Sequence, residues 1–397
     1  MKKAICVVLV CMLSLALFGC SQTAPAADDT SAQPAVSQSS GTEETVDQAS
    51  AEPSADAKVS IRIGWSPPDI TGVFKTATDY MEAAAEQARE HGIDVEVVTR
   101  SNTSHTDAAS QVESIENFIQ DKMDVIIISP SEVEAVKPAI KAANDAGIPV
   151  ILVNMLEKQD EIQVASYIGF DNAQAASVSA YSMLDALGGP GVLGEGETAT
   201  LPEDGMLDLE WWKGGYANVD KNSVSGNVAI IEGLAGDMFS NQRNEGFHAV
   251  MDQYPGIKVL TTIAADWNRQ KGIEAAENIL QNYSELDAIF ASSNEMGIGA
   301  YNAVKDAGRE NEVIVITNDG TSESVDMIRA GQLTAETWHG FPDWGWYGVK
   351  FAVMLAYGQE IPEQYDIMPR TEYIGNADDF YPNPKLEEID WEAIING

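Results

Sequence analysis

The sequence predicts an α/β protein built as two doubly wound, Rossmann-like lobes, each with a parallel sheet. From Val59 onward, short β-rich runs alternate with amphipathic helical stretches, a pattern typical of βαβ units. The alternation occurs in two successive series. The length of 397 residues also exceeds the roughly 150 residues expected of one domain. We therefore expect two half-proteins, each large enough to bury a core of its own.

The first series runs from residue 59 to residue 154. Its first helical stretch has apolar residues at helical spacing and ends at Gly92, a residue type that readily closes a helix. A continuous apolar run at 124–130 predicts a central strand that is buried on both faces. Pro138 suits the first turn of a helix, so the third helix is expected to begin there and to end at Gly147. The other strands of this series are expected at 59–65, 94–98 and 148–154.

The second series is joined to the first near residues 167–171. Its strands are expected at 227–232, 257–264, 288–292 and 313–317, each followed by a helix. Between them and the first series lies a Gly/Asp/Glu-rich stretch, 188–226, which fits neither period and is predicted to be an insertion on the second lobe. Its Trp211 and Trp212 are expected to pin this loop to the body rather than to bind a ligand.

The N-terminus has the anatomy of a secretion signal. Lys2 and Lys3 precede a short apolar run that ends in Leu-Phe-Gly-Cys, an order that resembles a bacterial lipobox with Cys20 as the lipid anchor. An ordinary signal peptide cleaved further on is the alternative. Residues 21–57 contain no aromatic residue and little apolar surface, which predicts a disordered tether. We expect residues 1–20 to be the signal and the mature chain to be extracytoplasmic and anchored to the cell membrane.

Charge, cysteines and absent motifs narrow the function. The net charge of −39 excludes nucleic acid as a partner, because phosphate binding depends on Lys and Arg. The three cysteines, Cys6, Cys11 and Cys20, leave no thiol in the mature body for a disulfide, a zinc site or a nucleophile. The sequence contains no P-loop, nucleophile elbow or zinc-protease motif. Its four histidines lack ligand spacing. We therefore expect no enzyme, no metal and no cofactor.

Polar and aromatic residues gather at the carboxyl ends of the predicted strands. In an open α/β sheet the ligand crevice lies at these ends. Indole faces, carboxylates and amides together suit a sugar, because the C–H face of the ring packs on an indole while the hydroxyls pair with Asp and Asn. The candidates on this ground are Trp65, Asp69, Asn154, Asp266, Trp267, Ser293, Asn294, Asn318 and Asp319.

Several candidates have a structural alternative. Asp319 could shape a turn or cap the helix expected at 321–330. Trp65 precedes a loop, which favours the cleft over the core. Phe74 belongs to an apolar stripe and could equally be a core residue. Arg243 could reach a ring oxygen or pair with Glu245 on the surface.

An ordered series of motifs resembles the type I periplasmic sugar-binding proteins of the ribose-binding kind. The resemblance extends from about Val59 to Tyr381, and the series is more specific than any one motif. It implies two lobes that close over one sugar, joined by a three-strand hinge. The motifs are Asp145–Ile151, Gly169–Asn172, Gly233–Gly236, Asn241–Phe247, Ala265–Trp267, Phe290–Met296 and Asn318–Thr321.

The resemblance also implies how the chain divides. The first lobe would comprise 59–168 and 340–368, and the second lobe 169–338 and 372–397. The hinge crossings would lie near 167–170, 338–340 and 368–373.

The binding positions that the resemblance implies are 65–71, Phe74 and Asn154 on the first lobe. On the second lobe they are Asn241, Trp267, Ser293 and Asp319, with His339 or its neighbours at the second crossing. The chain departs from the ribose-type pattern, which has Asp-Arg in place of Asn154-Met155, Arg in place of Asn241 and Asn-Asp in place of Ser293-Asn294. A different pentose, a polyol, a deoxy sugar or a furanone-like compound therefore remains open.

The implied function is that of a lipid-anchored, monomeric solute-binding protein. It would capture a small neutral sugar or polyol and deliver it to the permease subunits of an ABC importer. The alternative is a sensing module that presents a sugar or furanone-like signal to a membrane receptor. A hydrolase has no catalytic constellation to support it.

Overall fold

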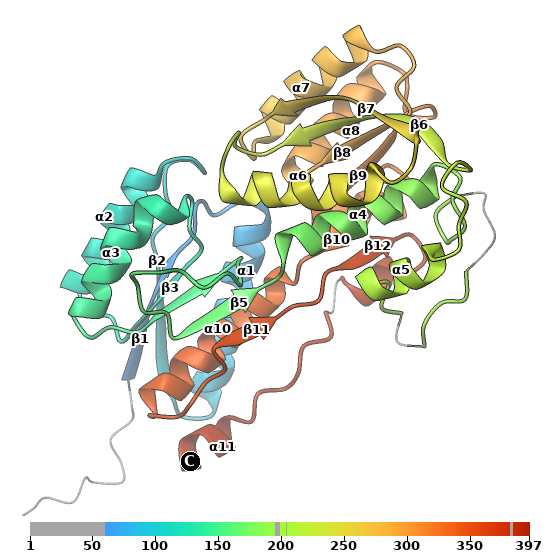
Figure 1. Ribbon diagram of the computed structural model, residues 1–397. Coiled ribbons are helices and arrows are strands. Elements are labelled where there is room, and N and C mark those ends of the chain that lie inside the picture. The colour runs from blue at the N-terminus through green and yellow to red at the C-terminus, as the bar shows by residue number, and fades with distance from the viewer. Residues whose placement is uncertain (1–59, 195–198, 204, 382–383) are drawn as a thin grey trace, which may run out of the picture. The chain divides into compact units, whose positions relative to one another are not determined.

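The computed structural model describes residues 60–194, 199–203, 205–381 and 384–397, and the strands in these residues form two six-stranded sheets (Figure 1). The first sheet, in spatial order, consists of β11 (Gln364–Asp366), β5 (Ser166–Gly169), β4 (Val150–Val153), β3 (Val125–Ile128), β1 (Ser60–Ser66) and β2 (Asp94–Thr99), all parallel. The second consists of β12 (Arg370–Tyr373), β10 (Ala335–Trp338), β9 (Ile314–Asp319), β8 (Ala288–Ala291), β6 (Ser225–Glu232) and β7 (Gly256–Ala264). Only β12 is antiparallel to its neighbour in the described sheets. The predicted fold class is confirmed.

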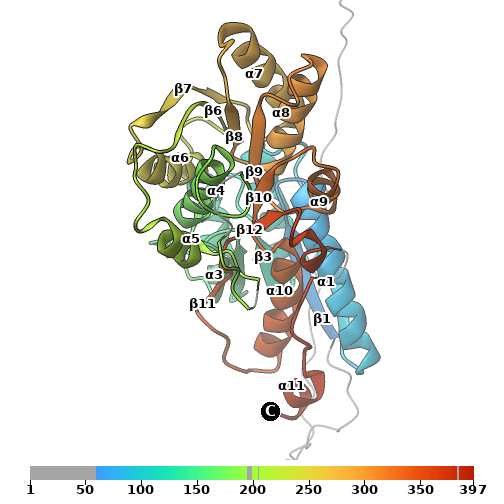
Figure 2. The ribbon, with the colours of Figure 1, turned by 90° about the vertical axis from the view of Figure 1, so that its right-hand side faces the viewer.

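Helices cover both faces of each sheet. On the first sheet, α1 (Gly72–Glu90) packs beside α10 (Phe341–Ala356), as Figure 2 shows, and α2 (Ala108–Gln120) packs beside α3 (Val133–Asp145) on the other face. On the second sheet, α4 (Asn172–Ala186) pairs with α6 (Met238–Met251), and α7 (Arg269–Asn282) pairs with α8 (Asn294–Asp306). The shorter elements are α5 (Leu209–Tyr216), α9 (Ser322–Arg329), η1 (Ala377–Asp379) and α11 (Trp391–Asn396).

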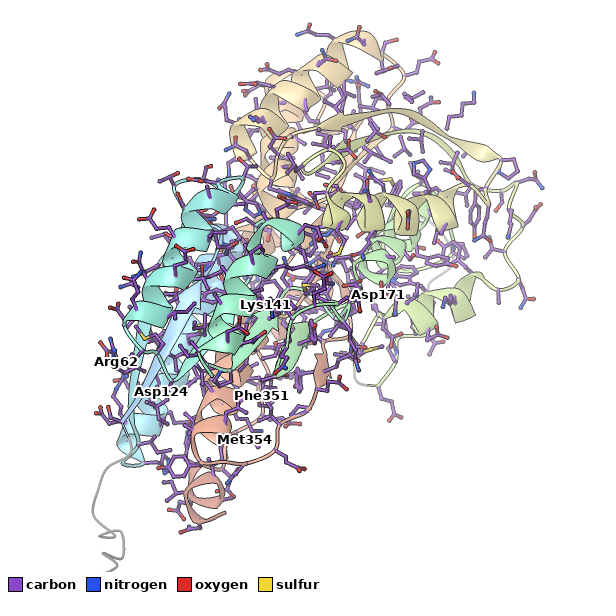
Figure 3. The ribbon with its side chains drawn as sticks, turned by 60° about the vertical axis from the view of Figure 1, so that its left-hand side comes forward. Arg62, Asp124, Lys141, Asp171, Phe351 and Met354 are labelled. Carbon is purple, nitrogen blue, oxygen red and sulfur yellow. The ribbon has the colours of Figure 1, made fainter. Side chains whose placement is uncertain are left out.

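The apolar patterns of the sequence account for these layers. In α1 the buried side chains recur every three or four residues, from Phe74 through Met81 to Ala88, so one stripe of the helix faces the sheet. Strand β3 is buried at every position and lies between β4 and β1, as the continuous apolar run predicts. Backbone N–H of Arg62 donates to Asp124 Oδ2 at 2.7 Å and joins β1 to the start of β3 (Figure 3).

The predicted start of the third helix is wrong. Helix α3 begins at Val133, so Pro138 lies inside it rather than at its first turn. The proline leaves the carbonyl of Glu134 without its helical N–H donor. Glu134 and Pro138 are both exposed, so water can satisfy that carbonyl, while the extra turn buries Val133 and Val136.

The chain passes between the two sheets three times in the described residues. It leaves the first sheet after β5, returns after β10 into α10, and leaves again between β11 and β12. These passages overlap the ranges 167–170, 338–340 and 368–373 that the family resemblance implies. At the first of them Asp171 begins α4, accepting a hydrogen bond from the Gln174 backbone N–H at 2.9 Å (Figure 3).

The expected range 372–397 for the second lobe is wrong at its end, because the last helix, α11, packs on the first lobe. Trp391 Nε1 donates to Gln87 Oε1 of α1 at 2.7 Å, and Gln359 donates to the carbonyl of Ile394 at 2.8 Å. Trp391 and Ile394 are both buried. The apolar face of α11 therefore contacts the first lobe. The expected range assigns α11 to the second lobe because it follows β12 in the sequence.

In the predicted insertion, Trp212 is buried in the core of the second lobe and its Nε1 donates to Thr371 Oγ1 at 2.8 Å. The prediction that this segment is pinned to the body is confirmed for Trp212. The predicted signal, the Cys20 anchor and the tether at 21–57 lie outside the described residues. None of the described helices has the length and apolar character needed to span a membrane.

Candidate ligand-binding site

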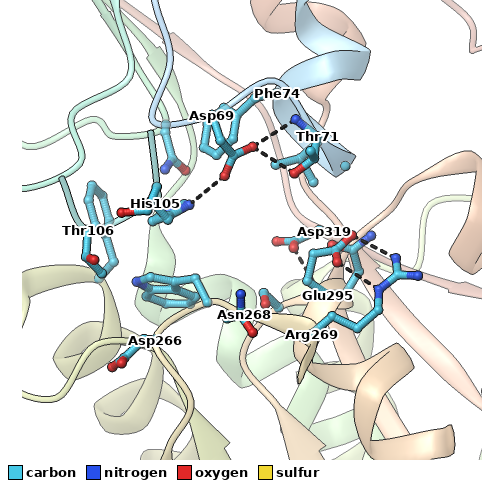
Figure 4. Close-up of a pocket in the computed structure, with 18 of the residues that line it drawn as sticks. Asp69, Thr71, Phe74, His105, Thr106, Asp266, Asn268, Arg269, Glu295 and Asp319 are labelled. Atoms are coloured by element: carbon cyan, nitrogen blue, oxygen red, sulfur yellow. Dashed lines mark hydrogen bonds and ion pairs between the residues drawn. The ribbon is translucent and has the colours of Figure 1, made fainter. Parts of the chain in front are cut away.

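The carboxyl ends of both sheets line one cavity of about 580 Å³ (Figure 4). The first lobe contributes the loop after β1, the N-terminus of α1 and residue 154 after β4, and the second lobe contributes residues that follow β7, β8 and β9. A crevice at this place is what the strand-end argument predicts. The predicted site residues on its wall are Asp69, Phe74, Asn154, Arg243, Asp266, Trp267, Ser293, Asn294 and Asp319.

On the second lobe, Asp319 is the centre of a buried polar network. It ends β9 with a φ of 121°, and its Oδ2 accepts a hydrogen bond from the Asn294 backbone N–H at 2.9 Å. Its Oδ1 lies 3.5 Å from an Arg243 nitrogen. Thr321, not Asp319, caps α9. The capping alternative for Asp319 is therefore wrong, and its carboxylate is held at the cavity wall instead.

Arg243 is a buried cation that is held by several polar partners. Only 4% of it is exposed, its Nε donates to Asn172 Oδ1 at 2.9 Å, and one terminal nitrogen donates to the carbonyl of Ser292. Burial lowers the pKa of Arg243, while the nearby carboxylate of Asp319 acts in the opposite direction. The surface pairing with Glu245 is wrong, because the guanidinium faces inward on α6.

Trp267 forms an aromatic wall directly above a glycine. Its ring lies 5.2 Å from the Arg243 guanidinium carbon, in a cation–π arrangement. A Cβ at Gly233 would come within 2.1 Å of the indole, so only glycine lets the ring lie there. Trp267 itself has a positive φ of 58°, which directs the side chain after β7 over the cavity.

The wall of the first lobe is built on Asp69. Its Oδ1 accepts hydrogen bonds from the backbone N–H and the hydroxyl of Thr71, both at 2.9 Å, and its Oδ2 lies 3.3 Å from His105 Nδ1 (Figure 4). Burial raises the pKa of Asp69, but the hydrogen bonds from His105 and Thr71 outweigh it, so the pKa is lowered overall. Asp69 is therefore an ionised carboxylate at neutral pH.

Phe74 and Asn154 complete the wall of the first lobe. The Phe74 ring is almost fully buried and lies 5.5 Å from the His105 ring, so this residue serves both the core and the cavity. Asn154 has a positive φ of 72°, and its backbone N–H donates to the carbonyl of Ile168 at 3.0 Å. Its buried Oδ1 has no hydrogen-bond partner in the described structure. That oxygen is free to accept a hydrogen bond from a ligand.

The charged side chains of the wall neutralise one another. Arg269 donates to Glu295 and to Glu323 through two hydrogen bonds each, between 2.7 and 2.9 Å. Lys271 pairs with Asp266. With the Arg243–Asp319 pair, every Arg and Lys on the wall has a carboxylate partner, while Asp69 is held by hydrogen bonds from Thr71 and lies 3.3 Å from His105 Nδ1. A bound anion or cation would compete with these pairs, so the cavity suits a neutral ligand.

Asn318 and three other predicted site residues do not reach the wall. Trp65 is 0% exposed in the core beside α1, where its Nε1 donates to Thr78 at 2.9 Å, so its expected place in the cleft is wrong. Asn241 is exposed and donates to the carbonyl of Gly236 at 3.2 Å, away from the wall. His339 is buried behind Asp319, with Nδ1 3.4 Å from Asp319 Oδ1, and its ring centroid lies 3.9 Å from that of Phe170, with the two rings tilted by 30°.

The structure also brings residues to the cavity that the sequence argument missed. His105 lies in the loop after β2, and Arg269 and Glu295 begin α7 and α8. All three residues lie after the end of a strand or in the first turn of a helix. Position after a strand end is the same signal that identified Asn154 and Ser293. His105 was considered only as a metal ligand. No group of three or more His, Cys, Asp or Glu side chains in the described parts of the chain could hold a metal ion.

Known proteins resemble this chain in sequence and in fold. The sequence profile of the periplasmic binding protein domain matches residues 63–360. The ribose import binding protein of Bacillus subtilis is 27% identical over 250 residues, which are 63% of this chain and 67% of that protein. The xylitol-binding protein of Mycolicibacterium smegmatis is 25% identical, and the match spans 58% of this chain and about half, 55%, of that protein.

A solved structure shows the likeness in fold. It is a periplasmic solute-binding protein of an ABC transporter from Actinobacillus succinogenes with D-allose bound. It has a TM-score of 0.67 and 22% identity, and the match covers 81% of this chain and 100% of that one. Two α/β lobes with predominantly parallel sheets are common to both.

Proposed function

Because the chain belongs to the periplasmic binding protein family, we propose that it captures a small neutral sugar or polyol between its lobes and delivers it to an ABC importer. The observation that carries this proposal is the cavity itself. Its wall combines an indole, a buried carboxylate–guanidinium pair and an unpaired amide oxygen, and each of its Arg and Lys side chains is paired with a carboxylate. The relatives whose names state ribose and xylitol binding support the same ligand class. We assign the protein ligand binding without bond chemistry, in keeping with its family of binding proteins.

Each wall group has a role in holding a polyhydroxylated ligand. The C–H face of the ligand packs on Trp267, where an aromatic face contributes most. Asp319 accepts hydrogen bonds from hydroxyls, and the Arg243 beside it adds a charged donor. Asn154 Oδ1 accepts from the side of the first lobe. A ligand that forms hydrogen bonds with both lobes at once stabilises the closed form.

Closure is the switch that this function requires. Gln242 of α6 donates to Glu157 Oε1 of the first lobe at 2.9 Å, and Phe239 packs into the apolar cluster that contains Met155. A ligand shifts the protein toward such a closed form only by binding it more tightly than the open form. The closed surface is then the one presented to the permease subunits.

The membrane attachment is part of the proposal and rests on the sequence. Cys20 after Leu-Phe-Gly would carry the lipid, and residues 21–57 would tether a monomeric body to the membrane. Growing the host with a radiolabelled fatty acid should label the wild-type protein. Cys20→Ala should abolish the label and release the protein from the membrane fraction. Retained label in Cys20→Ala would exclude this anchor.

Ligand binding is tested with the protein that lacks residues 1–57. A panel of D-ribose, D-allose, xylitol and myo-inositol is added, and the melting temperature is recorded. A ligand at 100 times its Kd should stabilise the native state by about 2.7 kcal/mol. The double variant Trp267→Ala/Asp319→Ala should lose that response. Silence of the wild type across the panel would refute sugar and polyol binding, and unimpaired uptake in a deletion strain would refute delivery.

A further inference from the structure

The imidazole of His105 lies on the cavity wall, where one ring nitrogen has a carboxylate partner and the other has no hydrogen bond among the described residues. Its ring is 5.5 Å from Phe74 of its own lobe and 6.1 Å from Trp267 of the other lobe. Nδ1 lies 3.3 Å from Asp69 Oδ2, whereas Nε2 has no hydrogen bond in the described structure. The side chain is 24% exposed, so it is neither a packed core histidine nor a surface one.

The Asp69 carboxylate fixes the tautomer of this imidazole. Asp69 Oδ1 is occupied by two hydrogen bonds from Thr71, so Oδ2, 3.3 Å away, is the oxygen that accepts the proton on His105 Nδ1. A neutral imidazole that donates from Nδ1 has its lone pair on Nε2. In that neutral form, the free nitrogen is an acceptor. The buried and unpaired Asn154 Oδ1 is a second acceptor on the same lobe.

We propose that His105 is a ligand-selecting residue whose Nε2 accepts a hydrogen bond from one hydroxyl of the bound sugar or polyol. This inference rests on the proposed function and narrows its ligand class. Two acceptors on the first lobe require hydroxyl donors on the face of the ligand that meets them. A furanone carbonyl, an ether oxygen or a deoxy carbon at that position would leave Nε2 unpaired, and sites built to pair a hydroxyl reject such analogues.

Two substitutions of His105 separate the roles of its nitrogens. His105→Asn places an amide near Nδ1 and keeps a partner for Asp69, whereas His105→Gln reaches the position of Nε2. His248→Asn is the matched control, because His248 also pairs its Nδ1 with a carboxylate, Asp252 at 3.1 Å, outside the cavity. Each variant of the protein without residues 1–57 is titrated calorimetrically with D-ribose, D-allose, xylitol and myo-inositol.

For the panel compound that the wild type binds most tightly, His105→Asn should weaken binding about tenfold, and His105→Gln should stay within about threefold of the wild type. His248→Asn should match the wild type. One deoxy analogue should reduce the affinity of the wild type most. The same analogue should reduce the affinity of His105→Asn little, because the missing hydroxyl has no hydrogen-bond partner in that variant. If His105→Asn folds poorly, Asp69→Asn gives the second test, since it frees the tautomer and should weaken binding severalfold.

The results divide cleanly. Equal affinity in the wild type, His105→Asn and His105→Gln overturns the inference, and so does an equal loss in both variants, because ring stacking rather than Nε2 would then matter. In either case the wild type still binds, and the proposed function stands. A wild type that binds none of the panel overturns the proposed function and this inference together.

Discussion

Glu336 and Glu372 lie directly opposite each other in the antiparallel β10–β12 pair, with both side chains buried. Glu336 Oε2 accepts a hydrogen bond from the Gly320 backbone N–H at 3.0 Å, but Glu336 Oε1 and both oxygens of Glu372 have no partner in the described structure. Burial and the mutual repulsion of two facing carboxyls favour the protonated state, against the opposing charges of Arg329 and Arg370 near Glu372. The pair lies behind the turn that follows Asp319, so it borders both the hinge and the site.

The pair predicts that stability falls as pH rises toward 8. Burial raises the pKa of Glu336 to about 8, against opposing hydrogen bonds, and burial together with Glu336 raises that of Glu372 well above its ordinary value. Above pH 6.5 the unfolded chain has lost these protons while the folded chain keeps them. The free energy of unfolding should therefore fall by about 1.4 kcal/mol per pH unit for each proton concerned. Urea unfolding at pH 6.5, 7.2 and 8.0 measures the slope.

Glu372→Gln should reduce the slope of stability against pH, because glutamine has nearly the shape of glutamate but does not titrate. The exposed Glu360→Gln serves as the control and should leave the slope unchanged. Below pH 6.5 His339 acts in the opposite sense, because burial lowers its pKa to about 4 and only the unfolded chain takes up the proton. An unaltered slope in Glu372→Gln would contradict the assignment.

Arg243→Lys should weaken ligand binding and stability together. Lysine keeps the charge, but its donors lie on a single nitrogen, which cannot occupy the positions of both Nε beside Asn172 and the terminal nitrogen beside Ser292 and Asp319. We expect about a tenfold loss of affinity and a loss of about 1.5–3 kcal/mol in the free energy of unfolding, since these are hydrogen bonds of a charged group. Calorimetric titration and urea unfolding measure the two effects.

Arg89→Lys is the control for that substitution. Arg89 has one described hydrogen bond, to the carbonyl of Val95 at 2.7 Å, which a lysine can also form. A wild-type affinity in Arg243→Lys would mean that the guanidinium is only structural.

The architecture could be predicted from the sequence, because the periodic patterns of strands and helices repeat clearly in both lobes. It located Asn154, Trp267 and Asp319 for the same reason, since the carboxyl ends of parallel strands must meet at one edge. It failed for Trp65, because a strand end does not say which face a side chain takes. At Trp65 the alternation directs the indole toward α1, where Thr78 receives its N–H.

Two other features depend on contacts between distant segments, which no local pattern contains. His105 follows a strand end, as a site residue should, but its contacts with Asp69 and Trp267 join segments that are far apart in the sequence. The return of α11 to the first lobe depends on Trp391 meeting Gln87, 304 positions away in sequence. Pairings of this kind could not be predicted from composition or periodicity.

Gly233→Ala should reduce affinity by displacing the Trp267 indole. The added methyl group would come within 2.1 Å of the ring, too close for any real contact. Overpacking of this kind costs about 1–3 kcal/mol, and part of that cost is expected as a shift of the ring away from the ligand. Tryptophan fluorescence with and without ligand, together with calorimetric titration, reports the displacement. Gly214→Ala is the control, because nothing lies within 4 Å of its position. Unchanged affinity in Gly233→Ala would show that the indole position does not matter for binding.

Glu295→Gln should weaken ligand binding by destabilising the contact between the lobes. Glu295 lies on the second lobe, yet a Cβ at Gly72, the first residue of α1, would be 3.1 Å from its Oε1. Helix α1 has no acidic residue in its first turn, and its N-cap Thr71 makes no side-chain capping bond. The Glu295 carboxylate therefore stabilises the positive end of α1 in the closed form, a contribution of about 0.3–1 kcal/mol. We expect about a two- to fivefold loss of affinity, seen mainly as faster ligand release in stopped-flow experiments. Glu323→Gln removes the other partner of Arg269 without touching α1, so equal losses in the two variants would assign the effect to Arg269 and not to closure.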